Sequence, residues 1–372
     1  MLMYFVMLLI PFLWLVMPER DRKTNHIIFV LSSAALLLIS SFRSEQMGAD
    51  YPQYIHYFDA IARFRDAYFE RGYVWYNYLL SRISTDYAML AFGVNMLLFI
   101  PLFYHIRNNV ENRYWALCVL IFVANPYMYV QTTFNMMRQC CATGFVLIAS
   151  QFFKKKSLLP SLAGMIFLLI AMQFHRSAIL IVPFILPCLF PIKWSGAIWR
   201  LIFFVLLGIN LTGAVEAICQ FFASGLSYGH YATYEASLLN NPPYLVLCLI
   251  FIWWMASVYD KLDQATKEDF FVNLFMIGMC LLPVAVKNDA VYRLRIYVQY
   301  ISLPGMVKII CAYSTKDSAR NEIPIKENER VRSGNSSLLE LLYVSYFMCF
   351  FIGYFTYLYL GDNTAYVPFQ FR

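Results

Sequence analysis

The sequence predicts an all-α polytopic membrane protein with about twelve transmembrane helices, built as a single integral domain over residues 1–372. Composition is the first observation behind this prediction. Of the 372 residues, 60% are hydrophobic and 14% are charged, whereas soluble domains carry about 25% charged residues. The second observation is that apolar runs of spanning length recur along the whole chain.

Twelve apolar segments are candidate spans, and hydropathy fixes their boundaries only to within a few residues. They are 2–17, 27–42, 87–104, 114–131, 139–153, 157–173, 177–190, 198–213, 244–258, 270–286, 296–312 and 338–359. Several are shorter than the ~20 residues that a hydrocarbon core of about 30 Å requires. We therefore expect tilted or broken helices among them.

The loops between these segments alternate in their lysine content. One set includes PERDRK, RNNVENR, KKK and a long loop over 313–337, and it holds nearly every lysine. Because lysine and arginine favour cytoplasmic loops, this set is predicted to be cytoplasmic. The other set includes a long loop over 43–86 and both termini, which are then predicted to lie outside.

Arginine does not follow the lysine pattern, since ten of the 18 arginines fall on the predicted outer side. The ten are Arg43, Arg63, Arg65, Arg71, Arg82, Arg138, Arg176, Arg293, Arg295 and Arg372. A guanidinium grips phosphate with two parallel hydrogen bonds and keeps its proton, so this surface indicates an anion such as a lipid phosphate or pyrophosphate. The alternative is that some of these arginines snorkel to headgroups or pair with loop acids.

The outer loop over 43–86 is too long for a plain connection. Its pattern predicts an amphipathic helix that begins near Pro52, is closed by Gly72 and lies along the outer interface, with Glu70 on its polar side. Asp50 stands where a helix N-cap belongs, and it is also a candidate carboxylate for catalysis.

Two further outer motifs carry polar side chains at span ends. In FNMMRQ, the spacing of Asn135, Arg138 and Gln139 predicts one shared helix face that directs a cation and two amides the same way. In FHRSAI, His175 is a candidate general base, with Ser177 beside it. The alternative for His175 is an interfacial histidine that only forms hydrogen bonds. Its surroundings are expected to be partly dry and positive, which favours the neutral imidazole.

The motif YRLRIYVQY places Arg293 and Arg295 two residues apart at the start of a span, with Tyr297 one helical turn beyond the first. Two such close cations repel unless an anion lies between them, so the motif indicates phosphate. The nine cysteines lack metal-ligand spacing and are interpreted as small hydrophobic residues. No metal, no cofactor and no nucleic-acid partner is predicted.

In order along the chain, Arg43, GADYPQY, ERGY, NMMRQ, FHRSA and RLRIY resemble the EpsG-like branch of the Wzy polysaccharide polymerases. The resemblance covers about residues 43–300, although NMMRQ runs into CCA where the family usually continues with small apolar residues. It implies a membrane-embedded glycosyltransferase fold in the bacterial inner membrane. It also implies that lipid-linked repeats of O-antigen, capsule or exopolysaccharide are joined on the periplasmic side.

The resemblance implies undecaprenyl-pyrophosphate-linked glycans as substrates, and a chain-length regulator is a candidate partner besides membrane lipids. The residue roles follow from side-chain chemistry. His175 is the first candidate base, with Asp50 and Glu70 behind it. The leaving pyrophosphate needs fixed cations, for which the candidates are Arg138, Arg293, Arg295 and then Arg43. The candidates for sugar contacts are Tyr51, Tyr54, Tyr73, Asn135, Gln139, Ser177 and Tyr297.

A flippase or transporter for lipid-linked oligosaccharide is the alternative function. Such a protein would carry cations deep within its spans and often two matched halves, whereas the charges here cluster at one face and no internal repeat is visible. A membrane acyltransferase that uses a cytosolic donor is disfavoured, because His175 is predicted to lie on the outer side.

Overall fold

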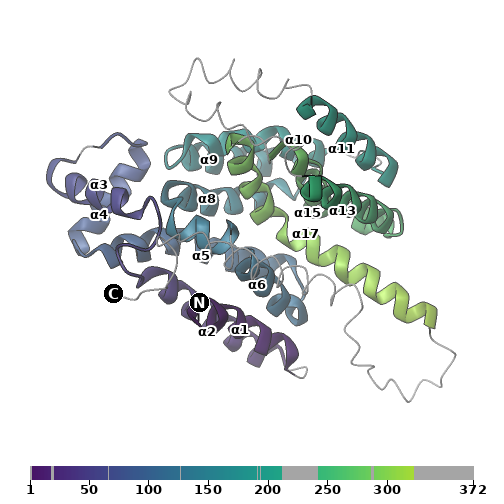
Figure 1. The fold of residues 1–372 in the computed structure, drawn as a ribbon, viewed down its shortest axis with the longest axis horizontal. Coiled ribbons are helices and arrows are strands. Elements are labelled where there is room, and N and C mark those ends of the chain that lie inside the picture. Colours follow the sequence, from purple (N-terminus) through teal and green to yellow (C-terminus); the bar gives the residue numbers. More distant parts are fainter. Residues whose placement is uncertain are drawn as a thin grey trace. The chain divides into compact units, whose positions relative to one another are not determined.

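In the residues that it describes, the computed structural model consists of helices joined by short connections (Figure 1). It describes residues 2–17, 21–65, 67–125, 127–190, 192, 194–211, 242–285 and 289–321. The all-α prediction is therefore confirmed for this part of the chain.

Eleven of the twelve candidate spans coincide with helices, and the twelfth, 338–359, lies outside the described residues. The helices at these positions are α1 (Leu2–Val16), α2 (Arg22–Ser41), α5 (Tyr87–Asn109), α6 (Trp115–Ala124) with η2 (Tyr127–Gln131), α8 (Met137–Phe153), α9 (Leu158–Met172), η3 (Arg176–Ile181) with α10 (Val182–Leu189), α11 (Gly196–Leu211), α13 (Pro242–Asp260), α15 (Phe270–Cys280) with α16 (Leu282–Ala285), and α17 (Asp289–Asn321).

Two of these helices, α2 and α5, are long and apolar enough to cross a membrane by themselves. A third candidate span is broken, because the helical pieces Asn112–Ala124 and Tyr127–Phe134 are bent by 71°. Several other apolar helices, including α1 and α9, have 10–17 residues. The described chain is thus a helical membrane protein with two or three span-length helices, and a crossing by each shorter helix stays a prediction.

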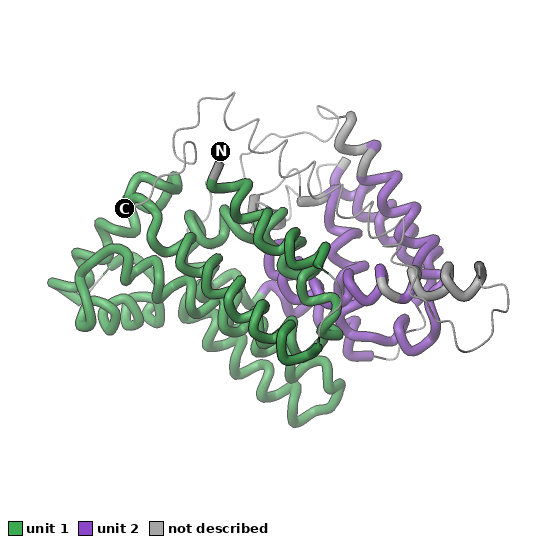
Figure 2. Tube along the Cα trace, turned by 90° about the horizontal axis from the view of Figure 1, so that it is seen from below, with its two compact units in different colours: residues 1–179, 336–372 green, residues 180–335 purple. Residues whose placement is uncertain are grey.

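The chain divides into two compact units (Figure 2). Unit 1 comprises residues 1–179 together with 336–372, and unit 2 comprises 180–335. Hydropathy does not separate them, and a single integral domain stays a prediction.

In unit 1, α2, α5, α8 and α9 pack in that order, as Figure 1 shows. Two shorter helices, α3 (Tyr51–Phe64) and α4 (Arg71–Ile83), cover the end at which α2 and α9 finish and α5 and α8 begin. We call this end of unit 1 the loop end and the other the opposite end. The outer loop predicted from the sequence is therefore the segment that builds the loop end.

The structure corrects the helix predicted between Pro52 and Gly72. Helix α3 stops at Phe64, because Arg65 adopts a left-handed conformation with φ 57°. Gly72 lies in the first turn of α4 and closes no helix. The predicted apolar stripe is nevertheless present on α3, where Phe58 and Ile61 are buried.

Helices α5 and α8 approach each other closely at Gly144. A Cβ added there would lie 1.8 Å from the Leu97 carbonyl oxygen of α5. Small residues at helix crossings let backbones touch, which is a common source of packing energy in membranes. The helix pair that carries the loop end is therefore fixed by a backbone contact.

Gly144→Ala is expected to destabilise the protein by about 1–3 kcal/mol, because the two helices must separate to accept the methyl group. Gly208→Ala is the matched control, since a Cβ at this position in α11 meets nothing within 4 Å. Alanine should there be neutral or stabilising by up to about 1 kcal/mol. Thermal unfolding in detergent measures both, and an equal response of the two variants would contradict the close packing.

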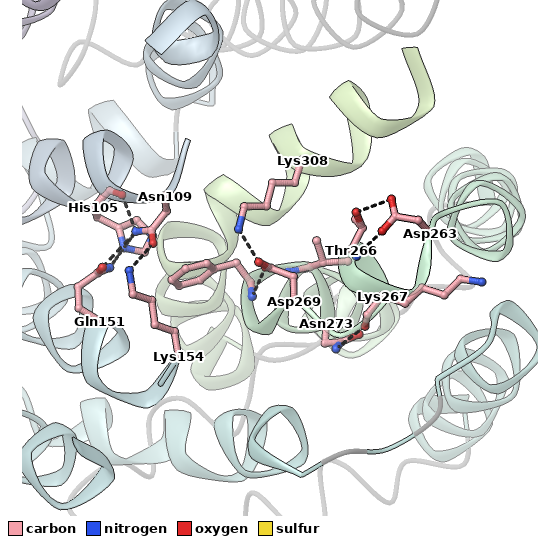
Figure 3. Close-up of polar contacts among 12 residues, drawn as sticks. His105, Asn109, Gln151, Lys154, Asp263, Thr266, Lys267, Asp269, Asn273 and Lys308 are labelled. Atoms are coloured by element: carbon pink, nitrogen blue, oxygen red, sulfur yellow. Dashed lines mark hydrogen bonds and ion pairs between the residues drawn. The ribbon is translucent and has the colours of Figure 1, made fainter. Parts of the chain in front are cut away.

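Partly buried polar contacts hold further helix ends (Figure 3). At the opposite end of unit 1, Asn109 Nδ2 donates to Gln151 Oε1 at 3.2 Å and Lys154 Nζ donates to Asn109 Oδ1 at 2.7 Å, which ties α5 to α8. Within unit 2, Lys308 of α17 pairs with Asp269, the N-cap of α15.

The described cysteines confirm their interpretation as small hydrophobic residues. Each one whose side chain the structure describes is buried: Cys118, Cys140, Cys141, Cys188, Cys248 and Cys280.

Candidate functional site

A buried carboxylate, Glu70, lies at the loop end between partners from distant parts of the chain. Arg138 Nη1 donates to Glu70 Oε2 at 2.9 Å. His175 Nδ1 lies 3.5 Å from the other oxygen, Glu70 Oε1. The side chains of Glu70 and His175 are 6% exposed and that of Arg138 is 23% exposed. In this Arg138–Glu70–His175 cluster, only the arginine is appreciably open to solvent.

The start of α4 positions Glu70. Glu70 is the N-cap residue, yet its side chain makes no capping hydrogen bond. The segment after α9 supplies a partner for the helix end instead, because Tyr73 N donates to Gln173 O at 3.1 Å. A Cβ at Gly72 would lie 2.7 Å from Gln173 Cβ, so glycine permits this approach. The same approach lets Arg176 N donate to Glu70 Oε1 at 3.3 Å.

A break in the helical path positions Arg138. Helix α7 (Thr132–Phe134) is capped by Asn135, and α8 starts at Met137 after a non-helical Met136. Asn135 and Arg138 therefore lie on different helical pieces, and the predicted face shared by Asn135, Arg138 and Gln139 is wrong. The break turns Arg138 toward Glu70, while Gln139 is buried within α8.

The Glu70 carboxylate stays ionised in the cluster. Burial disfavours its charge, but the hydrogen bond with His175 and the charge of Arg138 outweigh burial and lower the pKa of Glu70 to about 2. Such a carboxylate is a weak proton acceptor, so Glu70 is better suited to orient His175 than to act as the base. The sequence predicted positive surroundings for His175, whereas the structure places this carboxylate beside its ring.

Aromatic rings line the cluster. The Arg138 guanidinium lies 4.6 Å from the ring centre of Phe69. An interaction with the hydroxyl of Tyr54 favours the charged form of Arg138. Phe69 packs against Tyr57 at 4.5 Å and Tyr73 at 5.5 Å between ring centres. Tyr54, Tyr57 and Phe69 are half-buried, so they present ring surface to solvent next to Arg138.

The buried hydroxyl of Tyr73 and the buried Nε of Arg138 have no hydrogen-bond partner among the described residues. An unsatisfied buried polar atom typically costs about 1–3 kcal/mol, and each such atom needs an explanation. A polar ligand that reached the site would offer partners to both.

Arg43 and Tyr51, predicted to bind pyrophosphate and sugar, pack against each other at the loop end. Arg43 is 2% exposed, and it donates to the carbonyl oxygens of Ser40, of Met47 at 3.2 Å and of Phe134 at 3.3 Å. Its guanidinium lies 4.0 Å from the ring centre of Tyr51. These contacts hold the start of the outer loop, so neither residue is included in the cluster.

The other predicted residues of unit 1 are Asp50, Asn135 and Ser177. Asp50 is exposed and stands at the N-cap of α3 as predicted, but its side chain makes no capping hydrogen bond. Its backbone N–H donates to Asn135 Oδ1 at 3.4 Å. Ser177 is half-buried in η3, two residues beyond His175.

The remaining predicted residues belong to unit 2. They are Arg293, Arg295 and Tyr297, all on α17, and the side chain of Arg293 is outside the described part. Arg295 is half-buried, and Tyr297 is buried. With the Gln299 amide oxygen turned toward Arg295, the guanidinium donates to it at 3.0 and 3.3 Å. A shared site with the cluster in unit 1 stays a prediction.

Sequence reasoning missed two members of the aromatic lining, Tyr57 and Phe69. A signal was present for Phe69, which directly precedes the acid of ERGY. Sequence reasoning also ranked Glu70 only as a third candidate base, because the partners of this acid are 68 and 105 positions away along the chain.

The fold and the site together define a helical membrane protein with a charged, aromatic-lined cluster at one end of its first unit. The chain belongs to the EpsG family, whose family model matches residues 26–325, and this family is linked to exopolysaccharide biosynthesis. The match includes every residue of the cluster and confirms the resemblance drawn from the sequence. Comparison with curated proteins and with solved structures found no match.

Proposed function

We propose that this protein is a metal-independent polysaccharide polymerase that joins oligosaccharide repeats carried on undecaprenyl pyrophosphate. Membership of the EpsG family supports a role in exopolysaccharide biosynthesis. The observation that carries the reaction is the ionised Glu70 held between Arg138 and His175. The loop end would then face the outer side of the bacterial inner membrane, which the lysine distribution supports.

The proposed reaction is glycosyl transfer from a growing chain to a single repeat. The acceptor is a sugar hydroxyl, which loses its proton to His175 Nε2 as its oxygen attacks the anomeric carbon of the donor. The bond from that carbon to the pyrophosphate oxygen breaks, and the electron pair leaves with undecaprenyl pyrophosphate. Because the lipid pyrophosphate is already a leaving group, the transfer consumes no nucleotide sugar.

Glu70 positions the base in this reaction. Its Oε1 lies 3.5 Å from His175 Nδ1, an arrangement that places the Nδ1 proton toward the carboxylate and leaves Nε2 as the acceptor. The imidazolium formed after proton transfer is stabilised by the same carboxylate, which stays charged because its pKa is about 2. Arg138 fixes the other carboxylate oxygen and so completes the alignment.

Arg138 and the half-buried rings supply binding. Arg138 is the most exposed member of the cluster, and a fixed guanidinium stabilises charge that grows on a leaving pyrophosphate. Tyr54, Tyr57 and Phe69 present flat apolar surfaces next to this cation, which suits the apolar faces of sugar rings. The cation for the pyrophosphate and the rings for the sugar therefore lie side by side, as a sugar bonded to pyrophosphate requires.

Deletion of the gene in its host tests the polymerase activity. Cells without the protein are expected to lose long-chain polysaccharide and to accumulate single repeats on the lipid carrier. Those repeats should lie in the outer leaflet, where a membrane-impermeant oxidant such as periodate reaches them in spheroplasts. Complementation with the full chain should restore the polymer.

The same experiment separates polymerase from flippase. Loss of a flippase also removes polymer, but it leaves the single repeats in the inner leaflet, protected from the oxidant. Protected repeats would therefore replace the polymerase proposal with transport. Normal polymer in the deletion strain would rule out both the polymerase and the flippase function.

A further inference from the structure

A second charged site lies at the opposite end of unit 1, where α2 begins and α5 ends. A pocket of ≈ 330 Å³ is lined there by Arg22, Lys23, His26, Arg107 and Trp115. Its residues come from two span-length helices and from the first position of α6. None of them belongs to the Arg138–Glu70–His175 cluster.

The rim of this pocket is cationic. Arg22, Lys23 and Arg107 are exposed, and within the described residues no carboxylate lies within ion-pair distance of them. The nearest acid in sequence, Asp21, directs its carboxylate to the backbone N–H groups of Lys23 and Thr24. Three positive side chains thus face one pocket without a charge partner in the described part of the chain, which favours an anionic ligand.

The floor of the pocket is aromatic and polar. Trp115 is 2% exposed, packs against Phe29 with ring centres 5.0 Å apart, and donates from Nε1 to the Val110 carbonyl at 3.0 Å. The His26 ring stands edge-on to Trp115, and its buried Nδ1 has no hydrogen-bond partner among the described residues. Tryptophan and cations combined are typical of the level at which lipid headgroups lie.

The helix surfaces beyond the pocket are apolar. On α2, Ile27 and Leu31 follow Lys23 by four and eight positions, so they continue the same helix face, and both are exposed. On α5, Tyr104 and Ile100 precede Arg107 by three and seven positions and are also exposed. Each helix therefore presents a cation at its end and then an apolar strip that points toward the membrane interior.

We propose that this pocket binds the phosphate of an anionic phospholipid, whose acyl chains lie along the exposed strips of α2 and α5. A free phosphate would use the cations but not the apolar strips, so the strips favour the lipid. The lysine distribution predicts that this end lies on the cytoplasmic side, where anionic headgroups attract basic side chains. The site is independent of the proposed polymerase chemistry.

Native mass spectrometry of the detergent-purified full chain tests the site with phosphatidylglycerol as the probe. Each cation near an anionic headgroup contributes roughly fivefold in affinity, so Arg22→Gln/Lys23→Gln/Arg107→Gln should weaken retention of this lipid by about a hundredfold. Phosphatidylcholine, which has no net charge, should bind weakly to the wild-type chain.

The matched control is Lys155→Gln, which removes an exposed cation at the same end but outside the pocket. It should retain phosphatidylglycerol, and Arg107→Gln alone should show part of the loss if the triple variant does not fold. Equal retention by the triple variant and the wild type would overturn the lipid site, as would equal loss in the control. Displacement of the lipid by millimolar inorganic phosphate would assign the pocket to free phosphate instead.

Discussion

Replacing His175 with glutamine is expected to abolish chain extension while the protein still folds and inserts. Glutamine keeps a hydrogen-bonding side chain beside Glu70 but cannot accept a proton from the acceptor hydroxyl. A positioned base contributes about 10²–10⁴-fold to a reaction rate, so long polymer should become nearly undetectable. The measurement is the length distribution of polysaccharide in a deletion strain complemented with each variant, together with the amount of inserted protein.

The control for this result is His56→Gln, which changes an exposed histidine of α3 at the same loop end. Polymer length should not change in this variant. Normal polymer from His175→Gln would make His175 a structural hydrogen-bonding residue and would move the search for the base to Asp50. Asp50→Asn then tests the carboxylate, since asparagine occupies an N-cap position almost as well as aspartate.

The helices of this protein were predictable because the hydropathy of a segment depends only on that segment's own residues. The runs at 27–42 and 87–104 correspond to α2 and α5, with shifts of up to five residues at their ends. The end of α3 was not predictable, because Arg65, which turns the chain with φ 57°, is neither glycine nor asparagine. The close contact at Gly144 also requires knowledge of which helix lies opposite.

The three residues of the Arg138–Glu70–His175 cluster were predictable, but their pairing was not. The predicted outer motifs contain Glu70, Arg138 and His175, and the structure brings these three together. Arg43 has the same residue type and the same kind of position as Arg138, yet its donors are used by backbone carbonyls. Only long-range contacts separate an arginine that supports a loop from one that reaches a carboxylate and solvent.

Glu70→Gln is expected to lower both stability and activity. Removing one member of a buried ion pair leaves the other charge without its partner, at a cost of roughly 3–5 kcal/mol when both are fully buried. Arg138 is 23% exposed, so the lower end of that range, about 3 kcal/mol, is the expected upper limit here. The matched control is Glu111→Gln in an exposed pair with Arg113, which should cost about 0–1 kcal/mol.

The same carboxylate predicts how stability depends on pH. The pKa of Glu70 is lowered from 4.5 to about 2 in the folded protein, so the folded state binds this proton less readily than the unfolded chain. Its contribution is therefore complete above about pH 4.5 and is lost as the pH falls toward 2. In thermal unfolding, Glu70→Gln should lack this part of the acid destabilisation.

The double variant Glu70→Gln/Arg138→Gln separates structure from catalysis. It leaves no unpaired charge in the pair, so the melting temperature should recover part of what Glu70→Gln loses. Polymer should not recover, because His175 has lost the carboxylate that orients it and the pyrophosphate has lost its cation. Recovery of both stability and polymer in the double variant would show that the ion pair only supports the loop end. In that case, the proposed roles of Glu70 and Arg138 in the transfer would be wrong.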